Sequence, residues 1–361
     1  MSLTVKHLNA DTTFLITLRP DDGDLICWAS KQSPAFTILI DPWLSGRTVI
    51  GHRYFSSAEH SVESCINHLS QLDQEPDLVI ISQAKPDHCH EPTLRQIPSN
   101  SPRTTIVAEP RAANAIRKFN HFHPTKILSI PKYNSERPQS VLRFRIEPLT
   151  ESGAAGEVAV ALLPARDMAG VHNAIGITYQ APTAGLPSGS TGSPSTPLSK
   201  ASITPEPTGP APVPTARSET QHPPSLAREG VMSILYSPHG IPSNALLDEY
   251  ASKHLHVDTK ISNSRTLTLL IHSFTSVQSP WYLGGNIIAG ASRGGIALAK
   301  KLRAECWIGA HDEEKINGGV IMKFLKRERE TVADIMRLMR NGAVACDVRD
   351  LEVGGEVVLR A

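Results

Sequence analysis

One stretch of the chain, residues 76–94, constrains the fold more than any other. Its first part, Leu78 to Ile81, is a short apolar run rich in β-branched residues, which is typical of a buried central strand. A polar loop with Asp87, His88 and His90 follows at once. Loops at the ends of buried strands often carry functional side chains, because the strands hold them in place. Asp and His are common metal ligands in proteins. The stretch therefore predicts a metal site at the end of a central strand.

The composition predicts a chain that can bury a hydrophobic core and that carries little net charge. Of 361 residues, 40% are hydrophobic, which suits one large α/β domain or two ordinary ones. A net charge of +1 gives no reason to expect a nucleic-acid or membrane partner. No segment approaches the roughly 20 apolar residues of a membrane helix, and the first 20 residues do not form a signal-peptide pattern. The five scattered cysteines are expected to be reduced, which favours a cytoplasmic location.

Periodicity predicts strands and helices in two runs. The expected strands are 5–8, 13–18, 25–28, 36–40, 78–81, 104–108, 127–130, 141–148, 158–163, 174–179, 231–236, 267–271, 306–308, 344–348 and 356–359. The expected helices are 61–72, 93–97, 110–119, 243–255, 290–304 and 320–339. We expect the first four strands to form an antiparallel meander and the last two to pair with each other. This pattern alone indicates a mixed α/β fold with much antiparallel sheet.

The composition changes abruptly between about residues 181 and 228. Pro, Ser, Thr and Gly dominate there, and apolar residues are too sparse to form a core, so the segment is expected to be disordered. Tyr179 before it and residues 234–236 after it look like neighbouring strands. The segment is therefore interpreted as an insertion into a hairpin loop of one domain that spans residues 1–361.

Residues 82–88 also carry a family resemblance. They resemble the Ser/Thr-His-x-His-x-Asp-His signature of the metallo-β-lactamase superfamily, with Gln83 and Lys85 at the two leading histidine positions. The stretch Ile-Asp-Pro-Trp-Leu that ends at Leu44 resembles the lactonase-like branch of that superfamily. The resemblance implies an α/β (α+β) fold, a four-layer αββα sandwich with its site at one edge.

The resemblance also implies two metal positions, of which the first looks dismantled. Gln83 and Lys85 replace its two leading histidines. Its third histidine should follow the turn at 164–165, where Asp167 stands and His172 lies a little further on. We therefore count Gln83, Asp167 and His172 among the residues that surround the site rather than as ligands.

The second position looks retained. Asp87 and His88 stand at their places, His311 follows the last core strand, and His239 stands where the superfamily has a bridging aspartate. This set implies one divalent ion, with Zn²⁺ preferred and Fe²⁺ or Mn²⁺ open, because Ca²⁺ and Mg²⁺ prefer oxygen ligands. The competing interpretation is that each of these side chains simply bonds to its own loop.

Several neighbours have two possible roles. Asp41 either orients a metal ligand or accepts backbone N–H groups. Lys85 either replaces part of the missing Lewis acid and acts with Asp87 in catalysis, or is a solvated loop lysine. His90 is expected behind the ligands, and His172 either contacts the substrate or lies at a strand edge.

The resulting functional hypothesis is a metal-dependent hydrolase. Its ion would activate a water towards an ester, lactone, thioester, amide or phosphoester in a small-molecule substrate. The alternative is a catalytically degenerate binding or scaffold protein that keeps the sandwich. Loss of half the signature favours the alternative, and retention of a coherent Asp87, His88, His239 and His311 set favours the enzyme. The sequence does not indicate the substrate or the oligomeric state.

Overall fold

The computed structural model describes residues 1–20, 35–165, 171–184, 230–258, 264–283, 285–340 and 345–360. The expected strand at 25–28 and nearly all of the expected insertion at 181–228 lie outside these residues. None of the helices in the described ranges has the length and apolar composition that crossing a bilayer requires.

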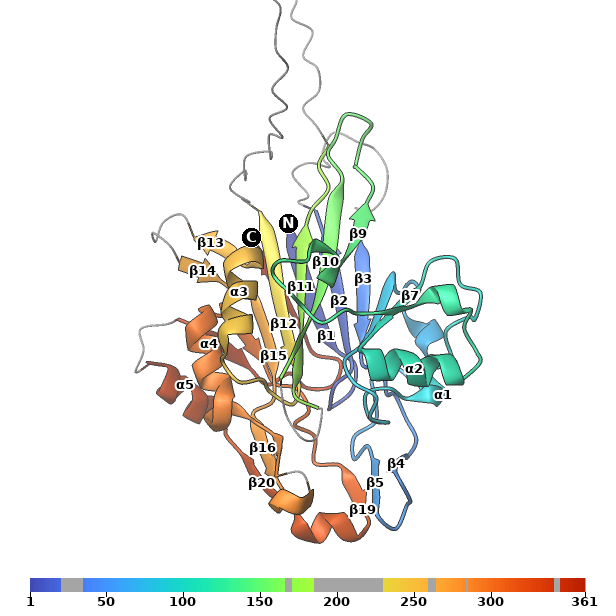
Figure 1. Cartoon of the computed structure of the whole chain (residues 1–361), viewed down its shortest axis with the longest axis vertical. Coiled ribbons are helices and arrows are strands. Elements are labelled where there is room, and N and C mark those ends of the chain that lie inside the picture. Colours follow the sequence, from blue (N-terminus) through green and yellow to red (C-terminus); the bar gives the residue numbers. More distant parts are fainter. Residues whose placement is uncertain are drawn as a thin grey trace, which may run out of the picture.

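Two seven-stranded sheets form the centre of the molecule (Figure 1). The first has the order β22 (Glu356–Arg360), β1 (Ser2–His7), β2 (Phe14–Arg19), β3 (Phe36–Ile40), β6 (Leu78–Ile81), β7 (Thr105–Ala108) and β8 (Ile127–Ser129). The second has the order β21 (Asp347–Arg349), β18 (Cys306–Ile308), β15 (Leu269–His272), β12 (Val231–Ser237), β11 (Asn173–Gln180), β10 (Gly156–Pro164) and β9 (Val141–Ile146).

The two sheets pack face to face around one apolar cluster. Phe14 and Ile80 from the first sheet and Ile177 and Ile271 from the second belong to it. In β1 and β2 buried and half-buried residues alternate, because one face of these strands meets this cluster. All four residues of β6 are buried, because a central strand is covered on both faces, as its unbroken apolar run predicts.

Helices cover the outer face of each sheet. α1 (Glu91–Leu94) and α2 (Pro110–Lys118) pack on the first sheet through residues such as Leu94 and Ile116. The helices α3 (Ala245–His254), α4 (Ile296–Leu302) and α5 (Val332–Arg340) pack on the second. The αββα sandwich that the sequence predicts is confirmed (Figure 1).

Small sheets and short helices complete the described chain. Two three-stranded sheets lie at the lower end in Figure 1: β17 (Asn286–Ile288), β16 (Thr275–Gln278) and β20 (Lys326–Arg329), and β19 (Ile316–Gly318), β5 (Ser56–Glu59) and β4 (Thr48–Ile50). A third small sheet pairs β13 (His256–Asp258) with β14 (Ser264–Thr266). The short helices are η2 (Leu69–Gln71), η3 (Pro124–Lys126), η4 (Pro138–Ser140), η5 (Trp281–Leu283), η6 (Ala291–Gly295) and η7 (Val320–Phe324).

The prediction of a helix over residues 61–72 is wrong. Only η2 forms there, because the N–H of Cys65, which in a helix would bond to the carbonyl of Ser61, bonds outside the segment. Glu313 accepts hydrogen bonds from the N–H groups of Ser61 and Val62 at 2.6 and 3.3 Å, and the N–H of Cys65 bonds to the carbonyl of Leu8.

The prediction of one long helix over residues 320–339 is also wrong. The chain forms η7, then β20 as an edge partner of β16, and begins α5 only at Val332. Thr331 starts α5 by accepting a hydrogen bond from the N–H of Asp334, as an N-cap does.

The last two strands do not pair with each other as predicted. β21 joins β18 in the second sheet, whereas β22 joins β1 in the first. The chain crosses between the sheets through the turn at Gly354, whose φ of +80° favours glycine and whose N–H bonds to the carbonyl of His7.

Candidate metal centre

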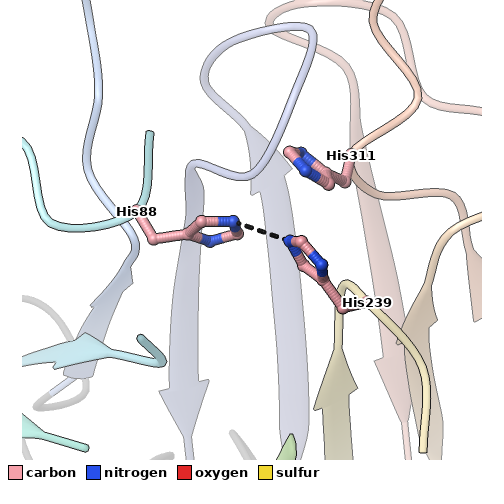
Figure 2. A group of neighbouring side chains, drawn as sticks. All are labelled: His88, His239 and His311. Atoms are coloured by element: carbon pink, nitrogen blue, oxygen red, sulfur yellow. Dashed lines mark hydrogen bonds between the residues drawn. The ribbon is translucent and has the colours of Figure 1, made fainter. Parts of the chain in front are cut away.

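The candidate site lies where parallel strands of both sheets end. β3 runs parallel to β6 in the first sheet, and β12 runs parallel to β15, which is parallel to β18, in the second. Because the carboxyl ends of parallel strands meet at one edge, the loops after β6, β12 and β18 come together. These loops carry His88, His239 and His311, whose rings converge in Figure 2.

The three histidines form a compact, buried cluster. None is more than 8% exposed. One ring nitrogen from each lies within 4.8 Å of the other two. Buried imidazoles this close cannot all carry a charge, so a shared proton or a bound cation would stabilise the cluster.

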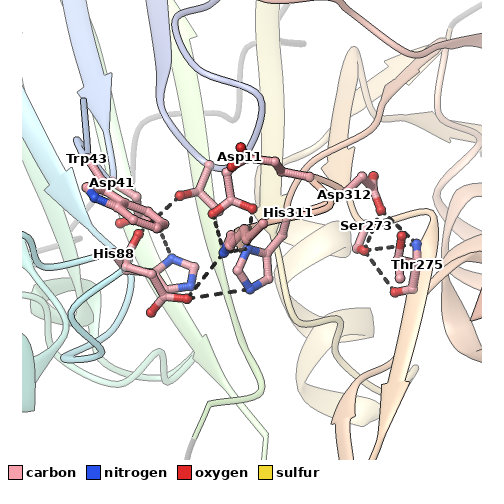
Figure 3. Close-up of polar contacts among 12 residues, drawn as sticks. Asp11, Asp41, Trp43, His88, Ser273, Thr275, His311 and Asp312 are labelled. Atoms are coloured by element: carbon pink, nitrogen blue, oxygen red, sulfur yellow. Dashed lines mark hydrogen bonds and ion pairs between the residues drawn. The ribbon is translucent and has the colours of Figure 1, made fainter. Parts of the chain in front are cut away.

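Each of these rings is oriented by an oxygen that can only accept a hydrogen bond. His88 Nδ1 lies 2.8 Å from Asp41 Oδ2, and His311 Nδ1 lies 2.8 Å from Asp11 Oδ1. His239 Nδ1 lies 2.8 Å from the carbonyl oxygen of Ile287. Figure 3 shows the two carboxylate pairs. Each Nδ1 therefore carries the hydrogen, and each Nε2 keeps a lone pair. Metal-binding histidines are held in this way.

The spacing of the free nitrogens fits a metal ion. His88 Nε2 and His239 Nε2 are 3.3 Å apart, although neither carries the hydrogen in the neutral tautomer set by its Nδ1 partner. Two nitrogens about 2.0–2.1 Å from one tetrahedral zinc ion would be about 3.3–3.4 Å apart. The cluster thus suits a divalent ion that prefers nitrogen ligands.

A proton is the competing occupant of this position. Burial opposes charge on His88, but Asp87 and Asp41 outweigh it and raise the pKa of that ring. Burial, together with the neighbouring His311 and His88, holds the pKa of His239 well below its usual value. Of the two rings, His88 therefore holds a proton more readily, and its Nε2 lies 3.3 Å from that of His239.

A second group of charged side chains adjoins the histidines. Asp87 Oδ2 lies 3.8 Å from His311 Nε2, and the ammonium of Lys315 lies 3.6 Å from the same oxygen. Lys315 also forms a 2.7 Å ion pair with Asp11 and sits 5.2 Å from the centre of the Trp43 ring. Lys315 is thus a largely buried cation beside the histidines.

The opposite charges in this group stabilise one another and so offset the free-energy cost of burying them. Burial alone would raise the pKa of Asp11 and Asp87, but the neighbouring His311 and Lys315, and for Asp87 also His88, lower both. Burial would lower the pKa of Lys315, but the two carboxylates raise it. Two carboxylates against one ammonium leave a net negative charge that a divalent ion would offset.

Two of the site residues have backbone conformations that are unfavourable for them. Asp41 has a φ of +41° and His311 a φ of +62°, in the left-handed region. Asp41 is held there by hydrogen bonds from the Ser82 N–H at 2.7 Å and the Tyr236 hydroxyl at 2.7 Å, in addition to His88. Strain of this kind persists where the surroundings fix it and is concentrated at functional sites.

Asp312 fastens the loop that carries His311. Its carboxylate accepts hydrogen bonds from the Ser273 hydroxyl at 3.0 Å and from the N–H groups of Phe274 and Thr275 at 3.0 and 2.8 Å (Figure 3). The ends of β15 and β18 are thereby tied together behind the cluster.

Comparison with known proteins identifies the architecture. A model of the β-lactamase superfamily domain matches residues 25–146, which include Asp41, Asp87 and His88. The solved structure of Igni18, a metallo hydrolase from the archaeon Ignicoccus hospitalis, aligns over all of both chains with 10% identity and a TM-score of 0.50. The chain has the metallo-β-lactamase fold.

Two further solved structures align less well. The metallo-β-lactamase fold protein YhfI of Bacillus subtilis is 10% identical over 99% of each chain, with a TM-score of 0.41. CmlA, a diiron β-hydroxylase of Streptomyces venezuelae, is 11% identical over 99% of this chain and 54% of its own, with a TM-score of 0.47. The curated proteins compared include no match. The lactonase-like branch stays a prediction.

The two positions at which the metallo-β-lactamase signature departs from histidine differ in environment. Gln83 is buried, and its Nε2 lies 3.0 Å from His88 Nε2, while its Oε1 has no hydrogen-bond partner in the described residues. Rotation of the amide would turn that oxygen towards the cluster. Lys85 is half-buried, and within the described ranges its ammonium forms no ion pair, whereas Lys315 contacts Asp87.

The remaining predicted residues lie around the cluster or outside the described chain. His90 bonds to the Thr93 hydroxyl at 2.9 Å, and burial lowers its pKa to about 4. His172 contacts the carbonyls of Gly240 and Asn286, each at 3.0 Å, beside His239. Asp167 lies outside the described residues.

Sequence reasoning missed Asp11, Lys315 and Tyr236. Asp11 lies in the turn between β1 and β2, where Asn9 accepts hydrogen bonds from two backbone N–H groups. An Asn-x-Asp turn after a strand was the available signal, as was a lysine four residues after His311. Neither signal indicates that the two side chains meet, because 304 positions separate them.

A cavity of about 250 Å³ opens beside the charged group. Asp87, His311 and Lys315 form part of its lining. Its other walls include the apolar side chains Ile50, Val277, Ile288, Met322 and Leu325. A small substrate in this cavity would have an apolar surface on its sides and the candidate centre beneath it.

Proposed function

We propose that this protein is a metal-dependent hydrolase that holds one divalent ion with His88, His239 and His311, next to Asp87. The observation that carries the proposal is the convergence of three buried imidazoles, one ring nitrogen from each within 4.8 Å of the others, with each Nδ1 facing an acceptor oxygen. Zinc suits this nitrogen-rich set best, and Fe²⁺ or Mn²⁺ also suits it.

Residues next to the ion would have different roles in the reaction. When bound, the ion would polarise a substrate carbonyl or phosphoryl oxygen and lower the pKa of a water. Asp87 lines the cavity with an unprotonated carboxylate and would orient a nucleophilic water by accepting a hydrogen bond from it. Lys315, also in the cavity lining, would stabilise negative charge that develops on the substrate oxygen.

The substrate class follows from the cavity only in outline. An ester, lactone, thioester, amide or phosphoester of a small molecule fits the proposed chemistry, since the fold does not fix the reaction. A cytoplasmic location is part of the proposal, supported by the free state of all four cysteines in the described residues.

A non-catalytic binding protein is the second candidate. It is favoured by Gln83, whose amide lies against the Nε2 atom that a metal would need from His88. A protein that had lost its chemistry would keep the fold but bind no ion.

Metal content distinguishes the two candidates. We expect protein purified without added metal to contain about one transition-metal ion per chain by elemental analysis. His88→Ala and His311→Ala should each lose the ion, whereas Gln83→Ala should retain most of it. The matched control is His123→Ala, an exposed histidine far along the first sheet that bonds to Thr125.

Three results would count against the proposal. Two ions per chain would contradict a single centre, and none would favour the binding protein. Full metal content in both histidine variants would show that the ion binds elsewhere.

A further inference from the structure

The exposed large apolar side chains are concentrated at one end of the molecule. Nine of them, each 37–79% exposed, lie on the β4–β5 hairpin, on η5 and on the β19–η7 segment: Val49, Ile50, Tyr54, Phe55, Trp281, Tyr282, Ile316, Val320 and Phe324. We call these nine residues the apolar rim. Figure 1 shows β4, β5, β19, β16 and β20 together at the lower end, opposite the labelled termini. Exposed apolar surface gathered in this way marks an interaction site.

Seven of the nine rim residues, all except Trp281 and Tyr282, lie on connected elements. β5 pairs with β4 on one side and β19 on the other. The N–H groups of Val320 and Ile321 bond to the carbonyls of Tyr54 and Phe55 at 3.0 and 3.2 Å. Tyr54, Phe55 and Val320 therefore lie next to one another and form one continuous surface.

The charge of the rim segments has one sign. The stretches that hold the rim residues, 49–55, 281–282 and 316–324, contain Arg53 and Lys323 and no Asp or Glu. Among the described residues, Arg53 and Lys323 are exposed and form no ion pair with a carboxylate. The whole chain carries only +1, so this local excess is cancelled elsewhere in the sequence and is invisible in the total.

We infer that the apolar rim docks onto an anionic lipid surface. Trp and Tyr with nearby Lys and Arg are the side chains that prefer the boundary between apolar chains and charged headgroups. A second copy of this chain fits less well, because a two-fold contact would place the same basic residues against one another. The expectation of no membrane partner rested on the net charge and on the absence of spanning segments. Neither property excludes this kind of surface contact.

The rim adjoins the candidate centre. Ile50, a rim residue, lines the same cavity as Asp87, His311 and Lys315. An amphiphilic molecule at the lipid surface would therefore reach the cavity along the wall that Ile50 forms. The docking inference does not depend on a metal ion or on catalysis, so it is tested separately from the proposed function.

Vesicle co-sedimentation tests the inference. The full chain should sediment with vesicles of phosphatidylcholine mixed with phosphatidylserine, and much less with phosphatidylcholine alone. Binding should weaken as salt is raised, because screening reduces the attraction between the basic residues and the headgroups. Absence of binding to the anionic vesicles at low salt would overturn the inference.

Matched variants separate the apolar and the charged contributions. Arg53→Gln with Lys323→Gln should weaken binding about fivefold for each charge removed. Tyr54→Ser with Trp281→Ser should weaken it on the order of tenfold or more. Leu338→Ser and Val358→Ser, which change exposed apolar residues outside the rim, should bind like the parent chain.

Two results would favour another explanation. Equal loss in the control variants would show that binding is not specific to the rim. A concentration-dependent dimer in sedimentation equilibrium that Tyr54→Ser with Trp281→Ser dissolves, without vesicle binding, would assign the surface to a second copy.

Discussion

At the scale of single residues, the three histidines differ in what lies behind them. His88 and His311 are backed by the carboxylates of Asp41 and Asp11, and His239 is backed by a backbone carbonyl. A carboxylate makes an imidazole a stronger ligand and also a stronger base. His88 has two carboxylates near it and a raised pKa, so metal and proton compete at this ring first.

Metal affinity should therefore depend on pH in a defined direction. Below its raised pKa, His88 carries a proton that the metal must displace, so affinity should fall as the pH drops through that value and level off above it. Calorimetric titration of the metal-free protein with Zn²⁺ in buffers of different ionisation enthalpy should show release of a proton. Affinity that is flat across pH 5–8, with no proton released, would contradict this assignment.

Replacing Lys315 and replacing Lys85 should have different effects on stability. Lys315→Met removes the ammonium that pairs with the fully buried Asp11, so it should lower the free energy of unfolding by about 3–5 kcal/mol. Lys85→Met should change it by no more than about 0.5 kcal/mol, because Lys85 forms no ion pair in the described residues. Denaturant titration of both variants measures the difference.

The turnover of the same two variants tests which lysine acts in catalysis. If Lys85 substitutes for a missing metal, as the sequence suggests, Lys85→Met should lose about 10²–10⁴-fold in rate with the ion still bound. The contacts of Lys315 with Asp87 predict that Lys85→Met stays active. A slow Lys85→Met variant with normal metal content would restore the sequence-based hypothesis.

At the scale of elements, strand ends were predictable and loop contacts were not. The apolar runs that end before His88, His239 and His311 are visible in the sequence, and the resemblance placed these histidines around one site. The predicted helices at 61–72 and 320–339 were wrong because the N–H of Cys65 bonds to the carbonyl of Leu8 and because residues 326–329 pair with β16 as a strand. These contacts join distant parts of the chain, and no local periodicity records them.

The tie made by Asp312 can be tested at this scale. Asp312→Ala would leave two backbone N–H groups without their partner and free the loop of His311, so it should cost about 2–6 kcal/mol in unfolding free energy. Metal affinity should fall as well, because His311 would lose its fixed position. Glu314→Ala, an exposed neighbour, is the control and should change neither property. Unchanged metal affinity in Asp312→Ala would show that the loop is held by other contacts.

At the scale of the whole molecule, the two ends of the sandwich have different roles. The loops of the candidate centre and the apolar rim lie at the lower end in Figure 1, and both labelled termini lie at the upper end. β11 and β12 pair antiparallel with Gln180 opposite Val231, so the two ends of the chain that flank the insertion are adjacent. An insertion between these strands enters the fold at the end away from the site.

Removal of the insertion should therefore leave the sandwich and the metal centre intact. The deletion should begin at residue 185, because Thr183 bonds to the backbone of Leu149 and Ala154 and is part of the packed fold. Replacing residues 185–228 with a short Gly-Ser linker reduces the loop length about eightfold. At about 0.6 kcal/mol for each halving, the unfolding free energy should rise by roughly 1–2 kcal/mol, since the composition predicts little packing to lose. Denaturant titration and metal analysis of the shortened chain measure both properties. A marked fall in stability would mean that the segment packs on the body, and limited proteolysis that spares this segment in the full chain would support that conclusion.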